Sequence, residues 1–375
     1  MTSTRTPPIK VLHVTEAMGG GVVTFLQSIT KRQVEAGASV TVLYSTREDT
    51  PDHRDILMRF DERVRILEPI ASGRQFSKIV ALGRSARIHA RSNDVVHLHS
   101  SFAGGVGRLL PLGGAMPVYS PHGFAFLRTN TSPLARRLVR IAEAVLGRRG
   151  CLMVTSAGEV ALAKELGLSR VRHVQSGVPL ASIPEALAPV RETRPRKRVT
   201  MVGRMAYQKA PWRFAAVARA LSHRADFIWI GGGDLEDRER WIGDAPVDVL
   251  DWVSPDELES LLSETDVLLF PTLWEGMALS LVQAQSRGIP AVTSDVVGNR
   301  DTVVSDVSGF VCQSDADLIR ATGRLLEDEA LWHRMRVGAH QLARRTMIDD
   351  ELGRESIDAY ISWLSHRRSA RRIAR

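Results

Sequence analysis

The segment LLFPTLWEGMALSLVQAQSRGIPAVTSD, residues 268–295, places an acid, a glycine and an amide around the expected start of a helix. Glu275 and Gly276 follow an apolar run that ends at Pro271, and Gln283 lies eight residues after Glu275. Free N–H groups at a helix start favour an anion, and glycine lets that anion approach the backbone. The segment therefore predicts a ligand site flanked by a carboxylate and an amide.

Two cations follow an earlier apolar strand in GRMAYQK, residues 203–209. Gly203 allows a turn, and Arg204 and Lys209 then place positive charge near the end of that strand. A guanidinium can bind a diphosphate through two hydrogen bonds, and a lysine adds a point charge. The pair predicts phosphate binding more strongly than either cation would alone.

Glycine runs follow two other strands. In GGGD, Gly231 and Gly232 would let a ligand approach the backbone, whereas Asp234 is equally typical of a turn. In TEAMGGGVVTFL, the glycines at 19–21 open a helix and expose amides to an anion. This run is not G-x-G-x-x-G, and no acid ends the second strand, so a dehydrogenase-type dinucleotide site is disfavoured. A tight turn without a ligand remains the alternative for Gly19, Gly20 and Gly21.

Histidines lie at strand ends in the N-terminal half. His97 and His99 alternate along the strand VVHLH, and we expect His97 to be a core residue with satisfied hydrogen bonds. His122, in the turn Pro121-His122-Gly123, directly follows a short strand and is expected to face a ligand. We therefore regard His122 as a candidate functional residue.

Among the acids, Asp315 and Asp317 form an Asp-x-Asp pattern that binds metal in some sugar transferases. Here the pair lies in the first turn of a helix that Ser314 can cap, where acids favour the helix dipole. We predict a structural role for the pair and no metal site. Glu16 and Glu159 occupy positions near strand ends where they could contact an acceptor.

The elements that must position these residues form two series of short apolar strands alternating with helical patterns, which predicts parallel sheets covered on both faces. The fold class predicted from this pattern is α/β, with two doubly wound domains. We expect an N-terminal domain over 1–185, a linker over 186–198, a C-terminal domain over 199–352 and a final helix with a basic tail over 353–375. The predicted strands are 10–15, 39–44, 95–99, 118–120, 152–155, 171–174, 199–202, 227–230, 247–250, 267–270, 291–294 and 309–312.

The composition is that of a globular protein, with 44% hydrophobic and 25% charged residues among 375. The net charge of +8 is uneven: residues 1–190 hold 24 Lys/Arg against 14 Asp/Glu, which favours an anionic partner for that half. Cys151 and Cys312 are expected to be buried thiols. We see neither a signal peptide nor a spanning helix and expect a cytoplasmic protein. A nucleic-acid-binding protein is suggested only by charge and lacks any recognised motif.

Taken in order, GGGV, PHG, SGVP, GRMAYQK, IGGGD and the 268–295 segment resemble the family 4 glycosyltransferases of the GT-B fold, and the resemblance extends from end to end. The resemblance implies two Rossmann-like domains that face a cleft, with a nucleotide sugar bound by the C-terminal one. It also implies that the last helix crosses back to the N-terminal domain. It implies transfer to a glycan or lipid-linked acceptor with retention at the anomeric carbon. It further implies that no metal or other cofactor is needed, and it suggests assembly of an exopolysaccharide, capsule or O-antigen.

The resemblance also assigns roles to residues. Glu275 would contact the donor sugar, and Gln283 stands where the family has a second acid for the ribose. The amides around Met277, Ala278 and Leu279, next to Gly276, would approach the sugar and phosphates. Arg204 and Lys209 match the family's diphosphate-binding pair. His122 matches the family's histidine near the transferred sugar, and Gly19–Gly21 match its phosphate loop. Eight helical residues would rise about 12 Å, roughly the distance from that sugar to the ribose.

Several alternatives stay open at this point. Gln283 offers one acceptor oxygen where a carboxylate offers two, so donor binding is expected to be weaker, and a non-catalytic nucleotide-sugar-binding protein is possible. A sugar-nucleotide 2-epimerase shares the architecture. The basic amphipathic stretch 134–150 is either an ordinary surface helix packed on its domain or a helix that docks on the anionic inner face of the plasma membrane. The arginine-rich tail is either a solvated end or a second contact with anionic lipid. UDP- and GDP-sugars are equally compatible as donors.

Overall fold

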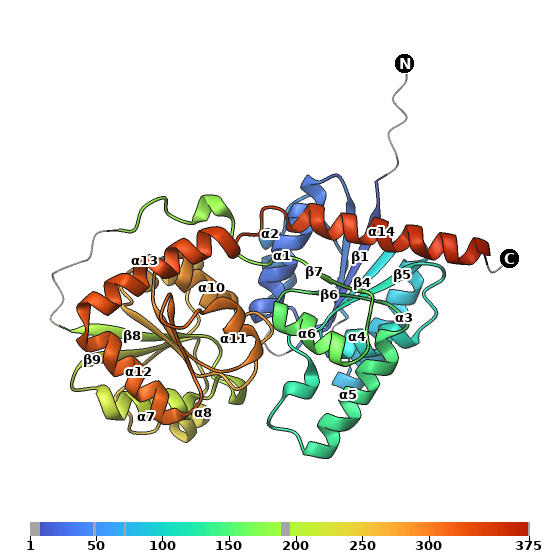
Figure 1. Cartoon of the computed structure of the whole chain (residues 1–375). Coiled ribbons are helices and arrows are strands. Elements are labelled where there is room, and N and C mark those ends of the chain that lie inside the picture. The colour runs from blue at the N-terminus through green and yellow to red at the C-terminus, as the bar shows by residue number, and fades with distance from the viewer. Residues whose placement is uncertain (1–7, 48–49, 71–72, 189–195, 374–375) are drawn as a thin grey trace. The chain divides into compact units, whose positions relative to one another are not determined.

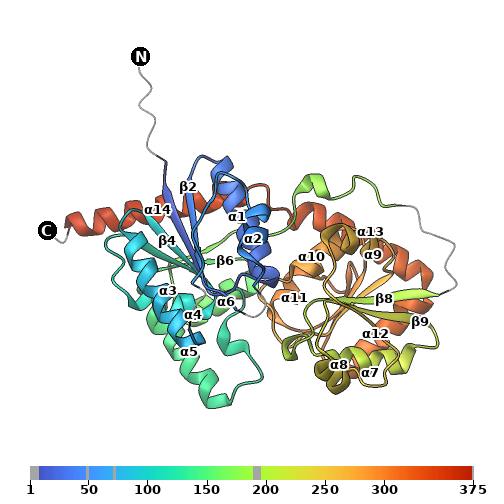
Figure 2. The same ribbon diagram turned by 180° about the vertical axis from the view of Figure 1, so that it is seen from behind.

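The computed structural model describes residues 8–47, 50–70, 73–188 and 196–373. The chain divides into two compact units (Figures 1 and 2). The first comprises Met1–Phe126, Pro133–Gln175 and Asp350–Arg375, and the second comprises Leu127–Ser132 and Ser176–Asp349. Part of the predicted linker, 189–195, and residues 374–375 of the basic tail lie outside the described residues.

The first unit is built on a parallel sheet of seven strands. The strands are β1 Lys10–Thr15, β2 Ser39–Tyr44, β3 Arg65–Ile66, β4 Val95–His99, β5 Met116–Ser120, β6 Cys151–Val154 and β7 Val171–His173. The helices are α1 Gly20–Glu35, α2 His53–Arg59, α3 Gln75–Ala90, α4 Ser101–Leu109, α5 Pro133–Gly147, α6 Ala157–Glu165 and α14 Leu352–Ile373.

The second unit is built on a parallel sheet of six strands. The strands are β8 Lys197–Val202, β9 Ala225–Ile230, β10 Asp248–Leu250, β11 Val267–Phe270, β12 Ala291–Ser294 and β13 Gly309–Cys312. The helices are α7 Pro211–Leu221, α8 Leu235–Trp241, α9 Pro255–Ser263, α10 Leu279–Ser286, α11 Val297–Thr302, α12 Asp315–Glu327 and α13 Glu329–Thr346. Short 3₁₀ turns are η1 Ala125–Leu127, η2 Leu180–Ser182 and η3 Tyr207–Lys209.

The predicted α/β class with two doubly wound sheets is confirmed, and each sheet has helices on both faces (Figures 1 and 2). Central strands such as β4 and β11 are buried along their whole length, which explains their continuous apolar sequence. The strand β3 was not predicted, because it has only two residues and neither of them is fully buried. The strand β8 begins at Lys197, inside the predicted linker.

The strand order locates the point in each sheet where a ligand is expected. The orders are β3-β2-β1-β4-β5-β6-β7 and β10-β9-β8-β11-β12-β13. The chain direction across the sheet therefore reverses between β1 and β4, and between β8 and β11. Open α/β sheets bind ligands at the carboxyl ends of the strands beside such a reversal. The predicted residues Gly19–Gly21, Arg204 and Glu275 all follow one of these four strands.

The last helix, α14, belongs to the first unit and packs against α1. The two helices approach so closely that a Cβ on Gly353 would lie 2.2 Å from the carbonyl oxygen of Arg32, so glycine is required there. Tyr360 of α14 is fully buried, and Trp363 and Leu364 of the same helix pack against the same core. Residues from the far end of the sequence thus complete the core of the N-terminal sheet.

Candidate functional site

In the second unit, the loops after β8 and β11 are joined at the point where the strand order reverses. Lys209 Nζ lies 2.8 Å from Glu275 Oε1, and both side chains are largely buried. Gln208 strengthens the junction, since its side chain donates to the carbonyl of Trp274 at 2.8 Å and its own carbonyl accepts from the amide of Leu273 at 2.8 Å. The structure thus brings together the predicted acid and one of the two predicted cations, which are 66 residues apart.

Glycines let the loop after β9 approach the loop after β8. Gly231 has φ 126°, and a Cβ there would lie 2.5 Å from the carbonyl oxygen of Gly203. That same oxygen accepts a hydrogen bond from the indole of Trp229 at 3.0 Å. Gly232 also has a positive φ, 61°. Asp234 caps α8 by accepting from the amide of Asp237, so its turn role is confirmed.

Helix α10 starts later than the sequence suggests. It begins at Leu279 with Ala278 as its N-cap, so Glu275 to Ala278 form a loop and not the first helical turn. The expected 12 Å rise of continuous helix between Glu275 and Gln283 is therefore wrong. No side chain caps this helix start, which leaves its first amides available to an anion.

Residues of α11 pack against the loop before α10. Gly298 is needed because a Cβ there would lie 2.0 Å from the carbonyl oxygen of Gly276. The buried Asn299 donates to Thr272 Oγ1 at 3.2 Å, and Ser294 donates to the carbonyl of Thr272. The segment containing Gly276 and Met277 is thus fixed by contacts that sequence reasoning missed. Gln283, on α10, is half-buried, and no hydrogen bond of its side chain to another described residue is present.

In the first unit, Gly19 is the N-cap of α1, which likewise has no side-chain cap. Gly20 has φ 57°, and a Cβ on either Gly20 or Gly21 would meet nothing within 4 Å. Packing within the chain does not require glycine at 21, so its small size leaves open space beside the first amides of α1. This arrangement is compatible with the predicted phosphate loop.

The two acids expected near an acceptor are both engaged by the protein itself. Glu16 is 1% exposed, accepts from the amide of Ala103 at 3.0 Å at the start of α4 and pairs with Arg47 at 3.1 Å. Glu159 is fully buried and accepts from the amides of Gly123 at 2.8 Å and Thr155 at 3.2 Å. These contacts account for burial of both carboxylates and leave acceptor contact as a prediction.

His122 adopts an unusual backbone conformation at the end of β5. Its φ of 51° lies in the left-handed region, which costs a non-glycine residue energy and is frequent at functional sites. The neighbouring amide of Gly123 is tied to Glu159, which holds this turn in place. His122 Nε2 lies 3.0 Å from His99 Nδ1. The prediction of a core role for His97 is confirmed, since it is fully buried with partners on both ring nitrogens.

The Asp-x-Asp pattern is structural, as predicted. Ser314 and Asp317 form a reciprocal capping box at the start of α12, and the hydrogen bond from Ser314 lowers the pKa of Asp317. Asp315 pairs with Arg213 at 3.0 Å. Both cysteines are buried and free, and burial raises the pKa of Cys151 to about 11.

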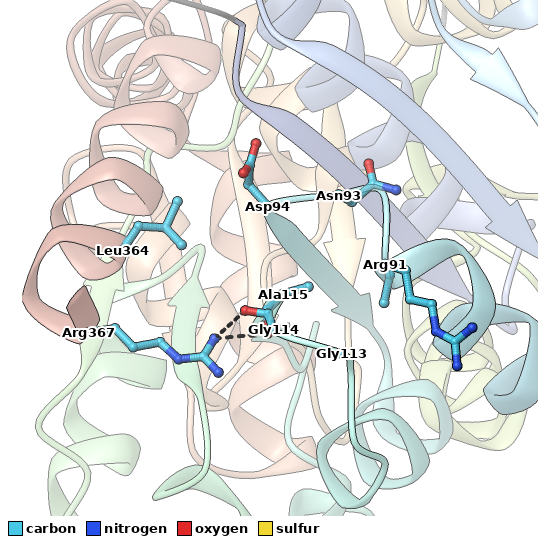
Figure 3. A pocket seen from close by; sticks show the side chains of 9 residues that line it. Arg91, Asn93, Asp94, Gly113, Gly114, Ala115, Leu364 and Arg367 are labelled. Atoms are coloured by element: carbon cyan, nitrogen blue, oxygen red, sulfur yellow. Dashed lines mark hydrogen bonds between the residues drawn. The ribbon is translucent and has the colours of Figure 1, made fainter. Parts of the chain in front are cut away.

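A small pocket of about 200 Å³ lies at the opposite edge of the first sheet, before β4 and β5 begin (Figure 3). Arg367 of α14 reaches into it and donates to the carbonyls of Gly114 and Ala115, each at 3.0 Å. Because ligands of doubly wound sheets bind at the carboxyl ends of strands, this amino-end pocket is not the candidate site.

Two family models match the chain. The model described as "Glycosyl transferase 4-like domain" matches residues 20–177, and "Glycosyl transferases group 1" matches residues 196–328. The chain belongs to the family 4 glycosyltransferases. These matches favour sugar transfer over the epimerase alternative.

Similar curated proteins include the Escherichia coli UDP-Gal:alpha-D-GlcNAc-diphosphoundecaprenol alpha-1,3-galactosyltransferase, 29% identical over 64% of this chain and 67% of that protein. An uncharacterized 41.2 kDa protein in the cps region of Klebsiella pneumoniae is 24% identical over 81% of this chain and 86% of that protein.

Solved structures show the same GT-B fold. Sucrose-phosphate synthase from Thermosynechococcus elongatus has a TM-score of 0.79 at 16% identity, covering 96% of this chain and 100% of that chain. HepE of Anabaena, solved with UDP-glucose, has a TM-score of 0.75 at 14% identity, covering 94% and 100%. At these identities the likeness shows the fold alone. Among the described residues, no helix is long and apolar enough to cross a membrane.

Proposed function

We propose that this glycosyltransferase moves a hexose from a nucleoside diphosphate sugar to a glycan or lipid-linked acceptor, with retention at the anomeric carbon, in assembly of a surface or exported polysaccharide. The observation that carries the proposal is the Lys209–Glu275 pair beside the uncapped start of α10, at the strand reversal of the second sheet. A cation, an acid and free helix amides in one place suit a ligand with a negative diphosphate and a sugar.

In this proposal the difficult step is departure of the nucleoside diphosphate from the anomeric carbon. Lys209, Arg204 and the amides of Ala278 and Leu279 stabilise the charge that grows on the leaving phosphate, which is electrostatic catalysis. Glu275 stabilises the positive charge that develops on the sugar. Because these protein groups supply the positive charge, we propose that no metal is required, and activity should survive EDTA.

The donor is proposed to be a UDP- or GDP-sugar. One relative is named for transfer from UDP-Gal, and one structural neighbour was solved with UDP-glucose, which makes uridine donors the first to test. Gln283 is proposed to bind the ribose through its amide oxygen. We expect weaker donor binding than a carboxylate would give, since a neutral hydrogen bond contributes about 0.5–1.5 kcal/mol and one to a charged group about 1.5–3 kcal/mol.

The acceptor side of the proposal rests on the orientation of α5. The side chains of Leu134, Leu138, Ile141 and Val145 make one face of this helix and are 52–66% exposed, while Glu143 is buried. The charged residue therefore faces inward and the apolar face outward, the reverse of an ordinary surface helix. The alternative of an apolar face packed on its own unit is wrong.

A buried ion pair holds α5 in this orientation. Arg108 of α4 contacts Glu143 Oε2 at 2.8 Å, and Tyr119 donates to Glu143 Oε1 at 3.2 Å. The guanidinium of Arg108 also stacks over the ring of Tyr119 at 4.0 Å. Exposed arginines border the apolar face at positions 137, 140, 148 and 149. An apolar helix face beside a basic border complements an anionic lipid surface, so we propose peripheral docking on a membrane that carries the acceptor.

The donor is tested by thermal shift with UDP, GDP, dTDP, ADP and NAD and the matching nucleotide sugars. A ligand at 100 times its dissociation constant should stabilise the protein by about 2.7 kcal/mol. We expect a shift with one nucleoside diphosphate and its sugars. Product formed with a lipid diphosphate–linked sugar acceptor is then analysed by NMR for its anomeric configuration. Donor binding without turnover would favour the non-catalytic alternative, and an inverted product would refute retention.

Membrane docking is tested by flotation with vesicles of phosphatidylcholine alone or with phosphatidylglycerol added. We expect binding only to the anionic vesicles and its loss in the variant Leu138→Ser, Ile141→Ser. The exposed Met58 and Leu57 of α2, substituted together by serine, form a control that removes similar apolar area elsewhere on the same unit. Equal flotation of both double variants would show that α5 is not the docking surface.

A further inference from the structure

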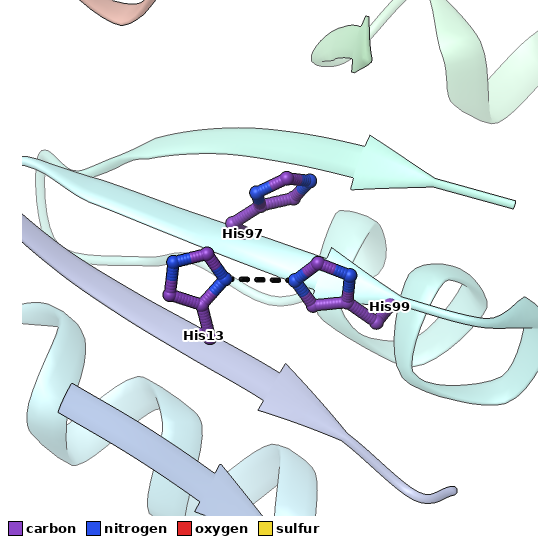
Figure 4. A group of neighbouring side chains, drawn as sticks. All are labelled: His13, His97 and His99. Atoms are coloured by element: carbon purple, nitrogen blue, oxygen red, sulfur yellow. Dashed lines mark hydrogen bonds between the residues drawn. The ribbon is translucent and has the colours of Figure 1, made fainter. Parts of the chain in front are cut away.

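Gln33, His13, His99 and His122 form a continuous chain of hydrogen bonds in the first unit, and His97 joins this chain through Tyr360. His13, His97 and His99 are fully buried, come from β1 and β4, and have ring nitrogens within 4.8 Å of one another (Figure 4). His13 Nδ1 lies 2.8 Å from His99 Nε2, and His99 Nδ1 lies 3.0 Å from His122 Nε2. At the other end, His13 Nε2 lies 2.8 Å from Gln33 Oε1. Two serine hydroxyls that donate to backbone carbonyls determine which ring nitrogen of each histidine carries the proton.

The first fixed donor is Ser120, whose hydroxyl donates to the carbonyl of Met153 at 2.6 Å. Ser120 must then accept from His97 Nε2 at 2.8 Å, so the proton of neutral His97 is on Nε2. His97 Nδ1 is therefore an acceptor and takes the hydroxyl proton of Tyr360 at 2.7 Å. Tyr360 in turn accepts from the side-chain nitrogen of Gln33 at 3.2 Å.

A second donor sets Gln33 independently. Ser356 donates to the carbonyl of Gly353 at 2.8 Å, so it accepts from Gln33 Nε2 at 2.9 Å. The hydrogen bonds to Tyr360 and to Ser356 both place the side-chain nitrogen of Gln33 toward α14, and hence its side-chain oxygen toward His13. The oxygen can only accept, so His13 carries its proton on Nε2.

The remaining protons follow in order. His13 Nδ1 is bare and accepts from His99 Nε2–H, and His99 Nδ1 is bare and accepts from His122 Nε2–H. This order requires that each ring carry a single proton. Burial lowers the pKa of His13 and of His122 to about 4 and those of His97 and His99 well below the usual value, so all four are neutral near pH 7.

We propose that the relay Gln33–His13–His99 fixes His122 in the Nε2–H tautomer and thereby presents its Nδ1 as an obligate hydrogen-bond acceptor for a ligand hydroxyl. The ligand identity rests on the proposed function, where sugar hydroxyls are the available donors. Gln33, His13 and His99 act as positioning residues because none needs to touch the ligand. A phosphate or carboxylate oxygen cannot donate to Nδ1, so the site selects a hydroxyl over an anion.

The ring of His122 is also fixed in space. It stacks on His99 at a centroid distance of 5.3 Å and an interplanar angle of 17°, and Phe25 contacts it edge-on at 4.8 Å. These contacts fix the plane of the ring, and the hydrogen bond between Nε2 and His99 Nδ1 at 3.0 Å selects one of its two flipped orientations, since a flip would put a carbon in place of Nε2. The tautomer and the orientation are therefore determined by the same buried residues.

The same three imidazoles could be considered for a metal ion. Every ring nitrogen of His13, His97 and His99 already has a protein partner at 2.7–3.0 Å. A metal ion would have to replace several of these bonds in a fully buried place. The hydrogen-bond relay accounts for the cluster without one.

The test is nitrogen NMR of the full-length protein labelled with ¹⁵N-histidine, in which bare and protonated ring nitrogens have well-separated shifts. The His122 signals are assigned by their loss in His122→Asn. We expect a bare Nδ1 and a protonated Nε2 in His122, His99 and His13. A protonated Nδ1 in His122 would overturn the proposal, whether or not the protein transfers sugar.

Two variants, each of which removes hydrogen bonding at Gln33, test whether the relay positions the His122 proton or only packs the core. Gln33→Met removes the acceptor of His13, so the tautomers of His13, His99 and His122 should become mixed, and kcat/KM should fall about two- to ten-fold. Tyr360→Phe leaves Ser356 to hold Gln33, so the signals of His97 should change and those of His122 should not. Unchanged His122 tautomers in Gln33→Met, or Zn²⁺ binding that shifts all three buried histidines of wild type, would refute the relay.

Discussion

At the scale of a single residue, position 283 has an amide where the family pattern has a carboxylate, and this difference is expected to change the strength of donor binding. Gln283 keeps the length of the acid that the family pattern has there but offers one acceptor oxygen and no charge. Its side chain lies half-buried on α10 without a hydrogen bond to another described residue, so it is available to a ligand. Glu275, eight residues earlier, is held by Lys209 and belongs to the reacting end of the proposed site.

Substitution Gln283→Glu is expected to tighten binding of the nucleoside diphosphate about five- to ten-fold, because a charge-assisted hydrogen bond to the ribose adds about 1 kcal/mol over a neutral one. Titration calorimetry measures the change. The 2′-deoxy analogue of the same nucleotide is the matched control and should gain much less. Unchanged or weaker binding of the ribonucleotide would remove Gln283 from the ribose site.

Substitution Glu275→Gln is expected to lower kcat about 100-fold or more while donor affinity changes far less, because it removes charge that matters most in the transition state. Steady-state kinetics separates the two effects. Glu239→Gln, at an exposed position of α8 in the same unit, controls for the loss of a carboxylate charge. A loss confined to KM would show that Glu275 only binds the donor.

At the scale of elements, α5 shows how a buried charge can set the orientation of a helix. Its apolar residues alone would turn it the other way, toward the core. Burying Glu143 against Arg108 and Tyr119 instead makes the inward face polar. Desolvating two charges is costly, and that cost is reduced by their mutual contact and by the hydrogen bond from Arg108 to the carbonyl of Gly104 at 2.8 Å, although Arg108 Nη1 is buried without a hydrogen-bond partner among the described residues.

Substitution Glu143→Ala should lower the free energy of unfolding by about 3–5 kcal/mol, because it leaves the guanidinium of Arg108 buried without its partner. Urea denaturation measures the loss. Replacing both residues, as Arg108→Met with Glu143→Leu, should recover much of it. Glu165→Ala breaks the exposed pair with Arg140 and should cost less than about 1 kcal/mol. Equal costs for the two single substitutions would contradict this account.

At the scale of the whole molecule, buried histidines make folding depend on pH. In the unfolded chain a histidine has a pKa near 6.5, whereas burial lowers those of His13 and His122 to about 4 in the folded protein. Between these values the unfolded chain binds more protons than the folded one. Stability is therefore complete above about pH 6.5 and is lost as the pH falls toward 4.

Thermal or urea unfolding between pH 7.5 and 4.5 should show this loss. Each pKa unit corresponds to about 1.4 kcal/mol, so full titration of His13 alone would cost roughly 3 kcal/mol. His13→Asn should reduce the pH dependence even if it lowers stability at pH 7.5. His333→Gln, at an exposed position, should leave the dependence unchanged. A flat profile down to pH 4.5 would mean that the buried imidazoles are not held neutral.

The sequence by itself determined the local features of this protein. Apolar runs such as 267–270 and 291–294 match strands residue for residue, because a strand buried on both faces needs a continuous apolar segment. The glycine turns at 19–21 and 231–232 and the helix cap at Ser314 were also predicted, because backbone conformation and capping depend on neighbouring residues.

Only the tertiary structure decided which distant residues meet. The order of strands placed β1 beside β4 and β8 beside β11, and so brought His13 to His99 across 86 residues and Lys209 to Glu275 across 66. It also fixed the protons of the histidine relay and turned the apolar face of α5 outward. Hydrogen bonds and buried charges select partners by position in space, and a local pattern of residue types carries no information about that position.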